Sequence, residues 1–506
     1  MRVTAHLISI ALLSFGCANR AVEDYESKRQ SLITSDLALR FDSEMHLSPK
    51  EQQVNQRFIA LRDSMISGYL SSGFFPPAEP FHLSKQHVEE TALFKLLRRM
   101  PKGGIHHLHG SAGIDFHWLI NRAVEMDDCY VFWDDDTQQF LKGETRFYRQ
   151  GEAPSGYRST KDLDTVEGFR EEWYDLLVFR EETAQDSVQI WDEFEKVFQR
   201  INGFFDYQPV FKDYTRSMID TLRADGLQHV EVRTIFRGGL YDLDHKPRSG
   251  YYNADSIIYL LKEVEAEVQA EDPNFTLRSI YTFLRFSPEE FVYQELIKAH
   301  YYKKRYPEMI VGFDLVANED AGKSTYFFKG VWDEIDSLGV AYGTKMDLYL
   351  HDGESDWAHV QNLYDAYLLN SKRIGHGFNL MHFPSLLPAI READICIEVS
   401  PLSNQILGYI DDLRIHPANY WLKYGIQCTI SSDDPGIFDY NGLSYDFWHV
   451  TLAWELDLRA LKQLALNSLE YSALDEHQKQ QSIRAWESRW DTFVDEADVY
   501  FTNLTL

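Results

Sequence analysis

The sequence predicts an α/β fold in which eight parallel strands, each followed by a helix, close into a (β/α)8 barrel. Short apolar or β-branched runs recur eight times after residue 103, each followed by loop-type residues and then by helical periodicity. The first two runs begin 125 residues apart, and the later ones follow at intervals of 22 to 48 residues, which suits strand–helix units. The runs are Gly104 to His109, His229 to Arg233, Leu277 to Leu284, Ile310 to Leu315, Met346 to His351, Arg373 to His376, Ile395 to Val399 and Gln427 to Ser431.

Residues 1–18 have the pattern of an export signal. Arg2 supplies a positive charge, Leu7 to Phe15 form an apolar stretch far shorter than the roughly 20 residues of a membrane span, and small residues end the segment. We therefore expect an exported protein, either secreted or periplasmic. The same stretch also resembles a bacterial lipoprotein signal, in which Cys17 would carry a lipid anchor, and simple cleavage after Ala18 is the alternative.

Residues 23–99 are predicted to form a helical arm that precedes the barrel. Apolar residues such as Phe58 and Leu61 recur at helical spacing, and no strand alternation interrupts them. The barrel itself is then expected to occupy residues 100–125 and 190–506.

The gap after the first strand is too long for a simple crossover, so residues 126–189 are predicted to form an inserted subdomain. Acidic and aromatic residues are concentrated there, for example Trp133 and Asp134. This composition suits a surface module that binds a partner, and a decorated loop without a binding role is the alternative. The final stretch from Glu476 to Tyr500 has apolar residues at helical spacing and is expected to pack as a helix.

Charge balance and cysteine content limit the classes of partner and of metal site. The chain of 506 residues has 79 acidic and 50 basic side chains, a formal charge of −29, and 44% hydrophobic residues. This composition is typical of a globular protein, and the acidic excess would repel nucleic acid phosphates and anionic lipid headgroups. The four cysteines have no C-x-x-C spacing, so any metal is expected to be held by histidines and carboxylates.

Histidines and acids follow four of the predicted strands at the ends where barrel active sites are built. His107 and His109 end the first strand, and the two-residue strand period points both rings to one face. The other candidates follow the fifth, sixth and eighth strands, namely His351 with Glu354, His376, and Asp433 with Asp434. Three imidazoles and one carboxylate suit zinc with a bound water of lowered pKa, which indicates a hydrolytic site. Taken singly, each piece is also common in turns and at core edges.

Eight motifs follow one another in a specific order, namely Met100 to His109, Glu231 to Arg233, Gly312 to Leu315, His351-x-Gly353-Glu354, Arg373 to Gly377, Glu398 to Gln405, Ser432 to Pro435 and Gly442 to Phe447. In this order they resemble the adenosine deaminase family, and more narrowly its secreted growth-factor-related branch, the adenosine deaminase 2 type. The likeness covers nearly everything after the signal segment. It implies a TIM barrel of the metal-dependent hydrolase type.

The resemblance further implies one zinc ion per chain and hydrolytic displacement of ammonia from C6 of a purine. The zinc ligands would be His107, His109, His351 and Asp433. The catalytic residues would be Glu354, which protonates N1, His376, which orients the attacking water and accepts its proton, and Asp434, which bonds N7. Substrate binding would involve Asp434, Glu354 and the backbone N–H near Ala317, which would meet N3. The family likeness also implies a homodimer formed through the helical arm and a surface partner for the insertion.

The sequence departs from the family pattern in three places. Gly110 and Ser111 follow the H-x-H motif where relatives have an aspartate that contacts the ribose, so the expected contact between a carboxylate and a sugar hydroxyl is missing. Ala317 stands where glycine is usual, and Asp352 replaces the usual alanine beside His351. None of these changes removes a predicted catalytic group.

The leading hypothesis is zinc-dependent deamination of adenosine, and of 2′-deoxyadenosine, to inosine-type products and ammonia outside the cytoplasm. A deaminase of another 6-aminopurine compound is an alternative. Two further alternatives are a non-catalytic signalling or binding protein built on a deaminase scaffold, and a metal-dependent hydrolase of an amide or ester. Nucleic acid is not expected as a partner.

Overall fold

The computed structural model describes residues 24–134, 139–180, 187–236, 238–244 and 254–504. The predicted export segment, with Cys17, lies outside these described residues. The first strand of the barrel, β1(Gly103–His109), follows a helix over residues 24–39 and the helices α2(Pro49–Ser72), α3(Phe81–Glu90) and α4(Ala92–Leu97).

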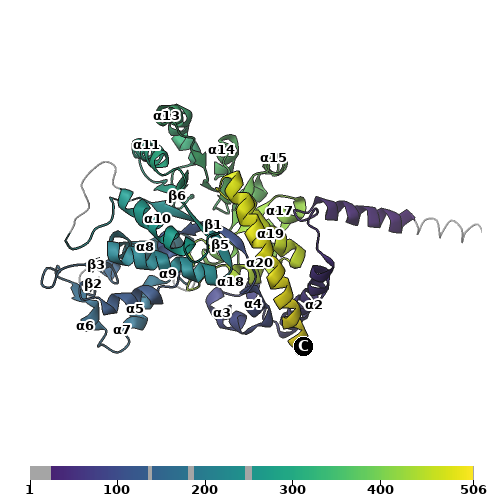
Figure 1. Cartoon of the computed structure of the whole chain (residues 1–506), viewed down its shortest axis with the longest axis horizontal. Coiled ribbons are helices and arrows are strands. Elements are labelled where there is room, and N and C mark those ends of the chain that lie inside the picture. Colours follow the sequence, from purple (N-terminus) through teal and green to yellow (C-terminus); the bar gives the residue numbers. More distant parts are fainter. Residues whose placement is uncertain (1–23, 135–138, 181–186, 237, 245–253, 505–506) are drawn as a thin grey trace, which may run out of the picture.

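The predicted parallel α/β barrel is confirmed (Figure 1). One sheet has the strand order β1-β5-β6-β7-β8, and the other has the order β12-β11-β10-β9. The strands after β1 are β5(Leu227–Ile235), β6(Thr276–Leu284), β7(Ile310–Val316), β8(Asp347–Leu348), β9(His351–Asp352), β10(Arg373–His376), β11(Cys396–Val399) and β12(Cys428–Ile430). The two sheets meet where Leu108 forms a parallel bridge with Asp433, which joins the first strand to the last.

The fifth predicted strand, Met346 to His351, was expected to be continuous, but it is divided into β8 and β9. The chain changes its hydrogen-bonding partner between them. Tyr349 N–H donates to Phe313 O of β7 at 3.1 Å, whereas Leu350 O accepts from Gly375 N–H of β10 at 2.8 Å. The break therefore marks the point where this strand passes from one sheet to the other.

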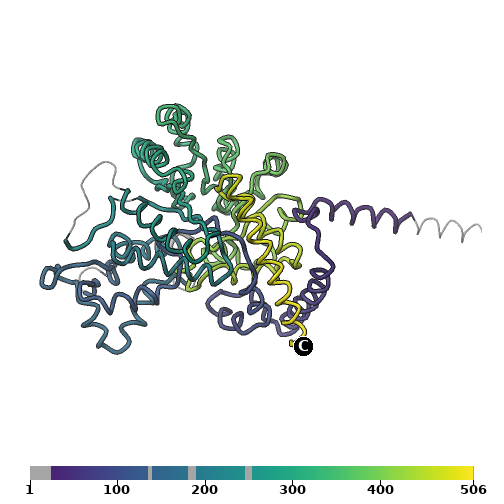
Figure 2. Tube along the Cα trace, viewed as in Figure 1, coloured from purple at the N-terminus to yellow at the C-terminus, as the bar shows by residue number. Residues whose placement is uncertain are grey.

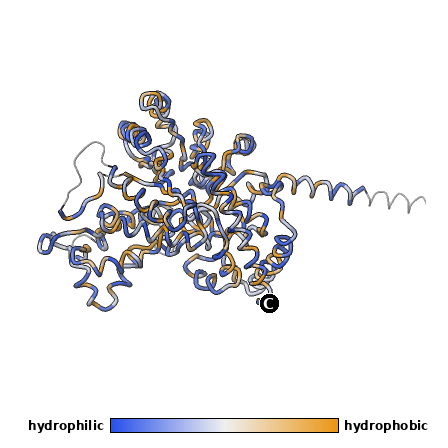
Figure 3. The backbone as a smooth tube through the Cα atoms, in the orientation of Figure 1, coloured by the Kyte–Doolittle hydropathy of each residue, from blue (hydrophilic) through white to orange (hydrophobic). Residues whose placement is uncertain are grey.

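Helices surround the barrel, and polar and apolar residues alternate along them (Figure 3). The α-helices after β5 are α10(Asp255–Gln269), α11(Glu289–Arg305), α12(Lys329–Trp332), α13(Ile335–Tyr342), α14(Asn362–Leu368), α15(Leu386–Glu392), α16(Pro401–Ile406), α17(Pro417–Tyr424), α18(Ser444–Ala453), α19(Leu458–Glu470) and α20(Glu476–Asn503). Short 3-10 turns are η1(Pro76–Ala78), η2(Gly110–Ala112), η3(Gln139–Leu141), η5(Thr325–Phe328), η6(Phe378–His382) and η7(Leu413–Ile415). Within the described part of the chain, no helix combines the length and apolarity needed to cross a lipid bilayer.

The α2 helix and the last helix, α20, lie side by side (Figure 2). The α2 helix begins at a capping box in which Ser48 caps the helix and Glu51 returns the hydrogen bond. Glu51 also accepts hydrogen bonds from Trp490 Nε1 of α20 at 2.7 Å and from Lys462 Nζ of α19 at 2.6 Å. One carboxylate thus connects the segment before the barrel with its C-terminal helices.

Between β1 and β5 in the sequence, the chain forms a small antiparallel sheet, in which β2 pairs with both β3 and β4. Its elements are α5(His117–Glu125), β2(Cys129–Phe132), β3(Thr145–Phe147), β4(Tyr157–Ser159), α6(Thr160–Leu163) and α7(Phe169–Leu177). They are followed by α8(Ser187–Asp206) and α9(Gln208–Ala224), which return the chain to the barrel. Cys129 of β2 is a buried free thiol, and so are Cys396 and Cys428.

Candidate active site

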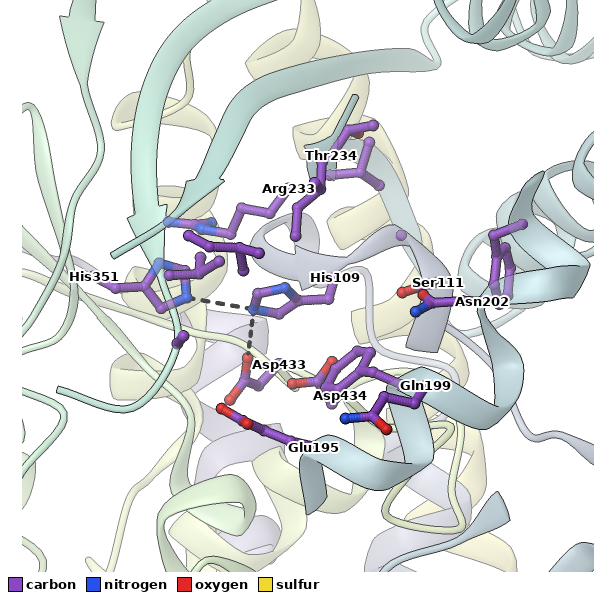
Figure 4. Close-up of a pocket in the computed structure, with 18 of the residues that line it drawn as sticks. His109, Ser111, Glu195, Gln199, Asn202, Arg233, Thr234, His351, Asp433 and Asp434 are labelled. Carbon is purple, nitrogen blue, oxygen red and sulfur yellow. Dashed lines mark hydrogen bonds and ion pairs between the residues drawn. The ribbon is translucent and has the colours of Figure 1, made fainter. Parts of the chain in front are cut away.

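Four side chains of the types that bind metals converge at the carboxyl ends of the strands. His107 and His109 come from β1, His351 from β9, and Asp433 from the loop after β12, and one ligand-type atom of each lies within 4.8 Å of the others. Asp433 Oδ1 lies 3.3 Å from His107 Nε2 and 3.2 Å from His109 Nε2. The Nε2 atoms of His109 and His351 are 3.3 Å apart (Figure 4). All four predicted ligands are therefore brought together.

The backbone is unusual at two residues of this centre. Asp433 has a φ of 64° and His376 has a φ of 63°, values in the left-handed region that residues other than glycine rarely adopt. Such conformations persist only where the surrounding structure enforces them, and they concentrate at functional sites. Here the enforcement comes from hydrogen bonds to β1, because Asp433 N–H donates to His107 O at 3.1 Å and Asp433 O accepts from His109 N–H at 3.0 Å.

Three of the four candidate ligands are oriented by a second residue. His107 Nδ1 donates to Glu398 Oε2 at 3.0 Å, and His351 Nδ1 donates to Asp314 Oδ2 at 2.6 Å. Because each Nδ1 faces a carboxylate, each Nε2 presents its lone pair to the shared centre. Asp433 is held by Ser403, whose hydroxyl donates to Asp433 Oδ2 at 2.7 Å.

Buried arginines neutralise the acids beneath the centre. Arg233 donates to Glu398 at 2.6 Å and to Asp314 at 3.0 Å, and Arg373 donates to Glu398 at 2.6 Å and to Glu231 at 2.5 Å. Burial alone would raise the pKa of Glu398, but the two arginine charges hold that pKa well below its usual range. Glu398 therefore remains an anion that accepts a hydrogen bond from His107 Nδ1.

The residues fit a zinc ion. His107 Nε2 is buried without a hydrogen-bond partner among the described residues, and it faces Asp433 and the other two ring nitrogens. An unpaired buried acceptor costs free energy unless a donor or a cation satisfies it. Three imidazole nitrogens and one carboxylate oxygen, each with an outer hydrogen bond or a fixed strand position, match the donor set of catalytic zinc sites.

Three further predicted residues adjoin this centre. His376 Nε2 lies 3.6 Å from Glu354 Oε1 and 3.9 Å from Asp433 Oδ2. Burial, and then the nearby charge of Asp433, raise the pKa of both Glu354 and Asp434 well above the usual range of a carboxyl. Glu354 is also fixed through its backbone, because its N–H donates to Glu319 Oε1 at 2.7 Å.

A cavity of about 270 Å³ opens onto the centre. Its lining includes His109, His351, Glu354, Asp433, Asp434 and Ala317, whereas His107 and His376 lie outside the lining. Ala317 follows β7 with a φ of 91°, where a side chain strains the backbone. The positive φ explains why the family pattern has glycine at this position. Alanine adopts the same backbone conformation here with added strain.

One wall of the cavity was not predicted as part of the site. The α8 helix contributes Trp191, Phe194, Glu195, Phe198, Gln199 and Asn202 to the lining. Gln199 and Asn202 project into the same space as Asp434 and Ser111 (Figure 4). The helical spacing of the aromatic residues in this stretch indicates an amphipathic helix, but a helix face packed on the core has the same pattern.

The outer contacts were also missed as functional residues. Glu398, Asp314 and Ser403 each belong to a motif of the family likeness, but no role was predicted for them. Their contacts to the ligands join residues distant in the chain, which local patterns do not reveal.

Comparisons with known proteins give a consistent family. A model described as adenosine deaminase matches residues 178–485, and a model described as adenosine/AMP deaminase N-terminal matches residues 7–97. Adenosine deaminase 2 of Dictyostelium discoideum is 34% identical over 483 residues, covering 94% of this chain and 88% of that protein. Adenosine deaminase 2 of Sus scrofa is 31% identical over 515 residues, covering 97% of each. An amidohydrolase from Burkholderia ambifaria, solved with bound Zn, has the same fold, with a TM-score of 0.56, 16% identity, and coverage of 81% of this chain and 96% of that one.

Proposed function

Because this chain belongs to the adenosine deaminase family and is an aminohydrolase, we propose that it converts adenosine and 2′-deoxyadenosine to inosine and 2′-deoxyinosine with release of ammonia. The observation that supports this most directly is the convergence of His107, His109, His351 and Asp433 beside a cavity that also contains Glu354 and Asp434.

One zinc ion per chain would be held by His107, His109, His351 and Asp433. When bound, the ion would lower the pKa of the water that attacks C6. Glu398, Asp314 and Ser403 would keep the ligands oriented through the hydrogen bonds already described.

The remaining groups would handle the purine. Glu354 has a raised pKa, so it would hold a proton near neutral pH and donate it to N1 as electrons move onto the ring. Asp434 has a raised pKa and a buried Oδ1 without a partner among the described residues, which supports a hydrogen bond to N7. The backbone N–H near Ala317 would meet N3, and His376 would orient the attacking oxygen.

Another 6-aminopurine compound is the second candidate substrate, because Gly110 and Ser111, directly after β1, supply no carboxylate to the cavity. Gly110 contributes only backbone there, and Ser111 is neutral. The α8 helix adds the amides of Gln199 and Asn202 and the carboxyl side chain of Glu195. This wall supports binding of a sugar by hydroxyl and amide groups, or of a purine with an altered sugar.

The first experiment measures ammonia release and the fall in adenosine absorbance with purified, zinc-loaded protein, with and without a chelator. Glu354→Gln is the test variant, because it keeps the shape of the side chain but cannot deliver a proton. We expect kcat to fall by about 10² to 10⁴ while substrate binding persists. Glu392→Gln, on the exposed end of α15, is the matched control and should retain full activity.

Undiminished turnover in Glu354→Gln would contradict the proposed acid. If the zinc-loaded wild-type protein released no ammonia from adenosine, 2′-deoxyadenosine or other 6-aminopurines, the deaminase assignment would be wrong. Binding of a purine without turnover would then favour the signalling alternative.

We also propose that the enzyme acts outside the cytoplasm, with residues 1–18 as its signal and either cleavage after Ala18 or lipidation of Cys17. The charged start and short apolar stretch of this segment support export. Mass spectrometry of the mature N-terminus distinguishes the two forms.

A homodimer formed through residues 23–99 is proposed as well. Residues 24–39 are helical and project away from the barrel (Figure 1), with Leu32 and Leu37 exposed at 69% and 50%. Exposed apolar side chains on a projecting helix favour a second copy as the partner. Light scattering of the full chain and of a Leu32→Glu, Leu37→Glu variant tests it. Residues 126–189 are proposed as a separate insertion with its own surface partner, and residues 100–125 and 190–506 as the catalytic barrel.

A further inference from the structure

We propose that His416, acting through Asn404, fixes the proton of neutral His376 on Nε2, so that His376 offers the cavity a hydrogen-bond donor and not a lone pair. His416 and Asn404 are then positioning residues for the deaminase site. The assignment of the proton stands on contacts alone, and its consequence for catalysis rests on the proposed function.

The chain of contacts begins at a donor whose direction is fixed. His416 is the N-cap of α17, and the backbone N–H of Ala418 donates to His416 Nδ1 at 3.1 Å. A backbone N–H can only donate, so His416 Nδ1 must carry no proton. The ring is buried, and this burial lowers the pKa of His416 to about 3, so the neutral ring has its single proton on Nε2.

The second contact fixes the orientation of an amide. His416 Nε2 lies 3.1 Å from Asn404 Oδ1, and its proton makes it the donor of that hydrogen bond. The carbonyl oxygen of Asn404 must therefore face His416, which removes the usual ambiguity between the oxygen and nitrogen of an amide. Asn404 is fully buried on α16, and its backbone N–H donates to Ser400 O at 3.0 Å.

The third contact extends the same hydrogen-bond direction to the active site. With its oxygen turned to His416, Asn404 presents Nδ2 to His376 Nδ1 at 3.4 Å. An amide NH₂ only donates, so His376 Nδ1 accepts, and the proton of the neutral ring is placed on Nε2.

The far side of His376 agrees with this assignment. His376 Nε2 is buried without a hydrogen-bond partner among the described residues and faces Glu354 Oε1 at 3.6 Å and Asp433 Oδ2 at 3.9 Å. The Asp433 carboxylate oxygen favours a donor opposite it. His376 would then hold the oxygen that attacks C6 by donating to it, in place of the expected role of accepting a proton from the water.

An isosteric substitution at Asn404 is expected to move the proton of His376 to the other ring nitrogen. In Asn404→Asp, the carboxylate accepts from both rings, so the proton of His376 moves to Nδ1 and a lone pair is left on Nε2. The direct readout is ¹⁵N NMR of histidine-labelled protein, metal-free and zinc-loaded, with the His376 signals assigned by their loss in His376→Gln. We expect a protonated Nε2 in the wild type and a protonated Nδ1 in Asn404→Asp.

Kinetics give the functional readout. Asn404→Asp should lower kcat by about 10² to 10³ with KM changed less than threefold, because the lost hydrogen bond acts on the reacting oxygen. Asn419→Asp, which adds the same charge on α17 close to His416, is the matched control and should keep both constants.

A wild-type His376 with its proton on Nδ1 would overturn the proposal, and this measurement needs no variant to fold. Equal kcat in Asn404→Asp and the wild type would remove the catalytic consequence. If the wild-type NMR result is as expected but adenosine is not deaminated, the proposed function fails while the proton assignment stands.

Discussion

Ser403 contacts the metal centre through Asp433, because its hydroxyl donates a hydrogen bond to Asp433 Oδ2 at 2.7 Å. Ser403→Ala removes this hydrogen bond without leaving a charge unpaired, so zinc affinity is expected to fall by about 10 to 100-fold. Chelator competition with the metal-free protein measures the change. Ser400→Ala is the matched control, because Ser400 is equally buried near α16 and its hydroxyl has no partner among the described residues.

An equal loss of zinc affinity in the two serine variants would contradict the orienting role of Ser403. Such a result would indicate that any cavity near α16 weakens the centre.

Single residues also set the limit of what local patterns predict. Four ligands were predictable because each lies at or just after the end of a predicted strand, and strand ends of a parallel barrel meet at one rim. They are His107, His109, His351 and Asp433. The left-handed φ of Asp433 depends on a bridge to β1, which lies far away in the chain, so no local pattern indicates it.

The α8 helix is the element that most changes the picture of the cavity. Its residue Asn202 faces Ser111, which follows β1 where the family pattern has an aspartate, while the reacting groups lie beyond (Figure 4). Asn202→Ala is expected to raise KM for adenosine about tenfold and to change kcat little, because the lost hydrogen bond is made equally before and during reaction. Steady-state kinetics with adenosine and with 2′- and 3′-deoxyadenosine locate the hydroxyl concerned.

Asp192→Ala, on the exposed side of the same helix, is the control for that experiment. A fall in kcat equal to the rise in KM in Asn202→Ala would contradict a contact confined to the sugar.

At the level of elements, the hydrophobic pattern of the sequence predicted where strands occur better than where each strand begins and ends. All eight predicted runs contain strand residues, since buried parallel strands give continuous apolar stretches. The fifth run is split because Tyr349 and Leu350 bond to different neighbours, and periodicity carries no information on partners. The α8 helix was missed as a wall because its amphipathic face contacts a cavity, and a face packed on the core has the same pattern.

Over the whole molecule, buried neutral histidines connect stability with pH. Burial lowers the pKa of His449 in α18 to about 4, while the unfolded chain has the ordinary value near 6.5. As pH falls below 6.5, His449 becomes protonated in the unfolded chain but stays neutral in the folded protein. The free energy of unfolding therefore keeps its full value above pH 6.5 and decreases between pH 6.5 and pH 4. At pH 5 the loss from this residue is about 2 kcal/mol.

The prediction concerns the slope of stability against pH. In metal-free protein, His449→Phe should lose less free energy of unfolding between pH 7.5 and pH 5.0 than the wild type, by urea titration at both values. His46→Phe, which removes a histidine at an exposed position, is the control variant. A wild-type slope in His449→Phe would show that this ring is protonated in the folded state.

The bridge between Leu108 and Asp433 has a consequence for biosynthesis. A ribosome completes β1, with two of the four candidate ligands, long before it makes the loop that supplies Asp433, so the growing chain cannot assemble the centre. Any ion that binds earlier meets an incomplete set of donors. The choice among competing divalent ions is therefore made only after Asp433 has joined β1, and the compartment in which the barrel closes decides which ion is available.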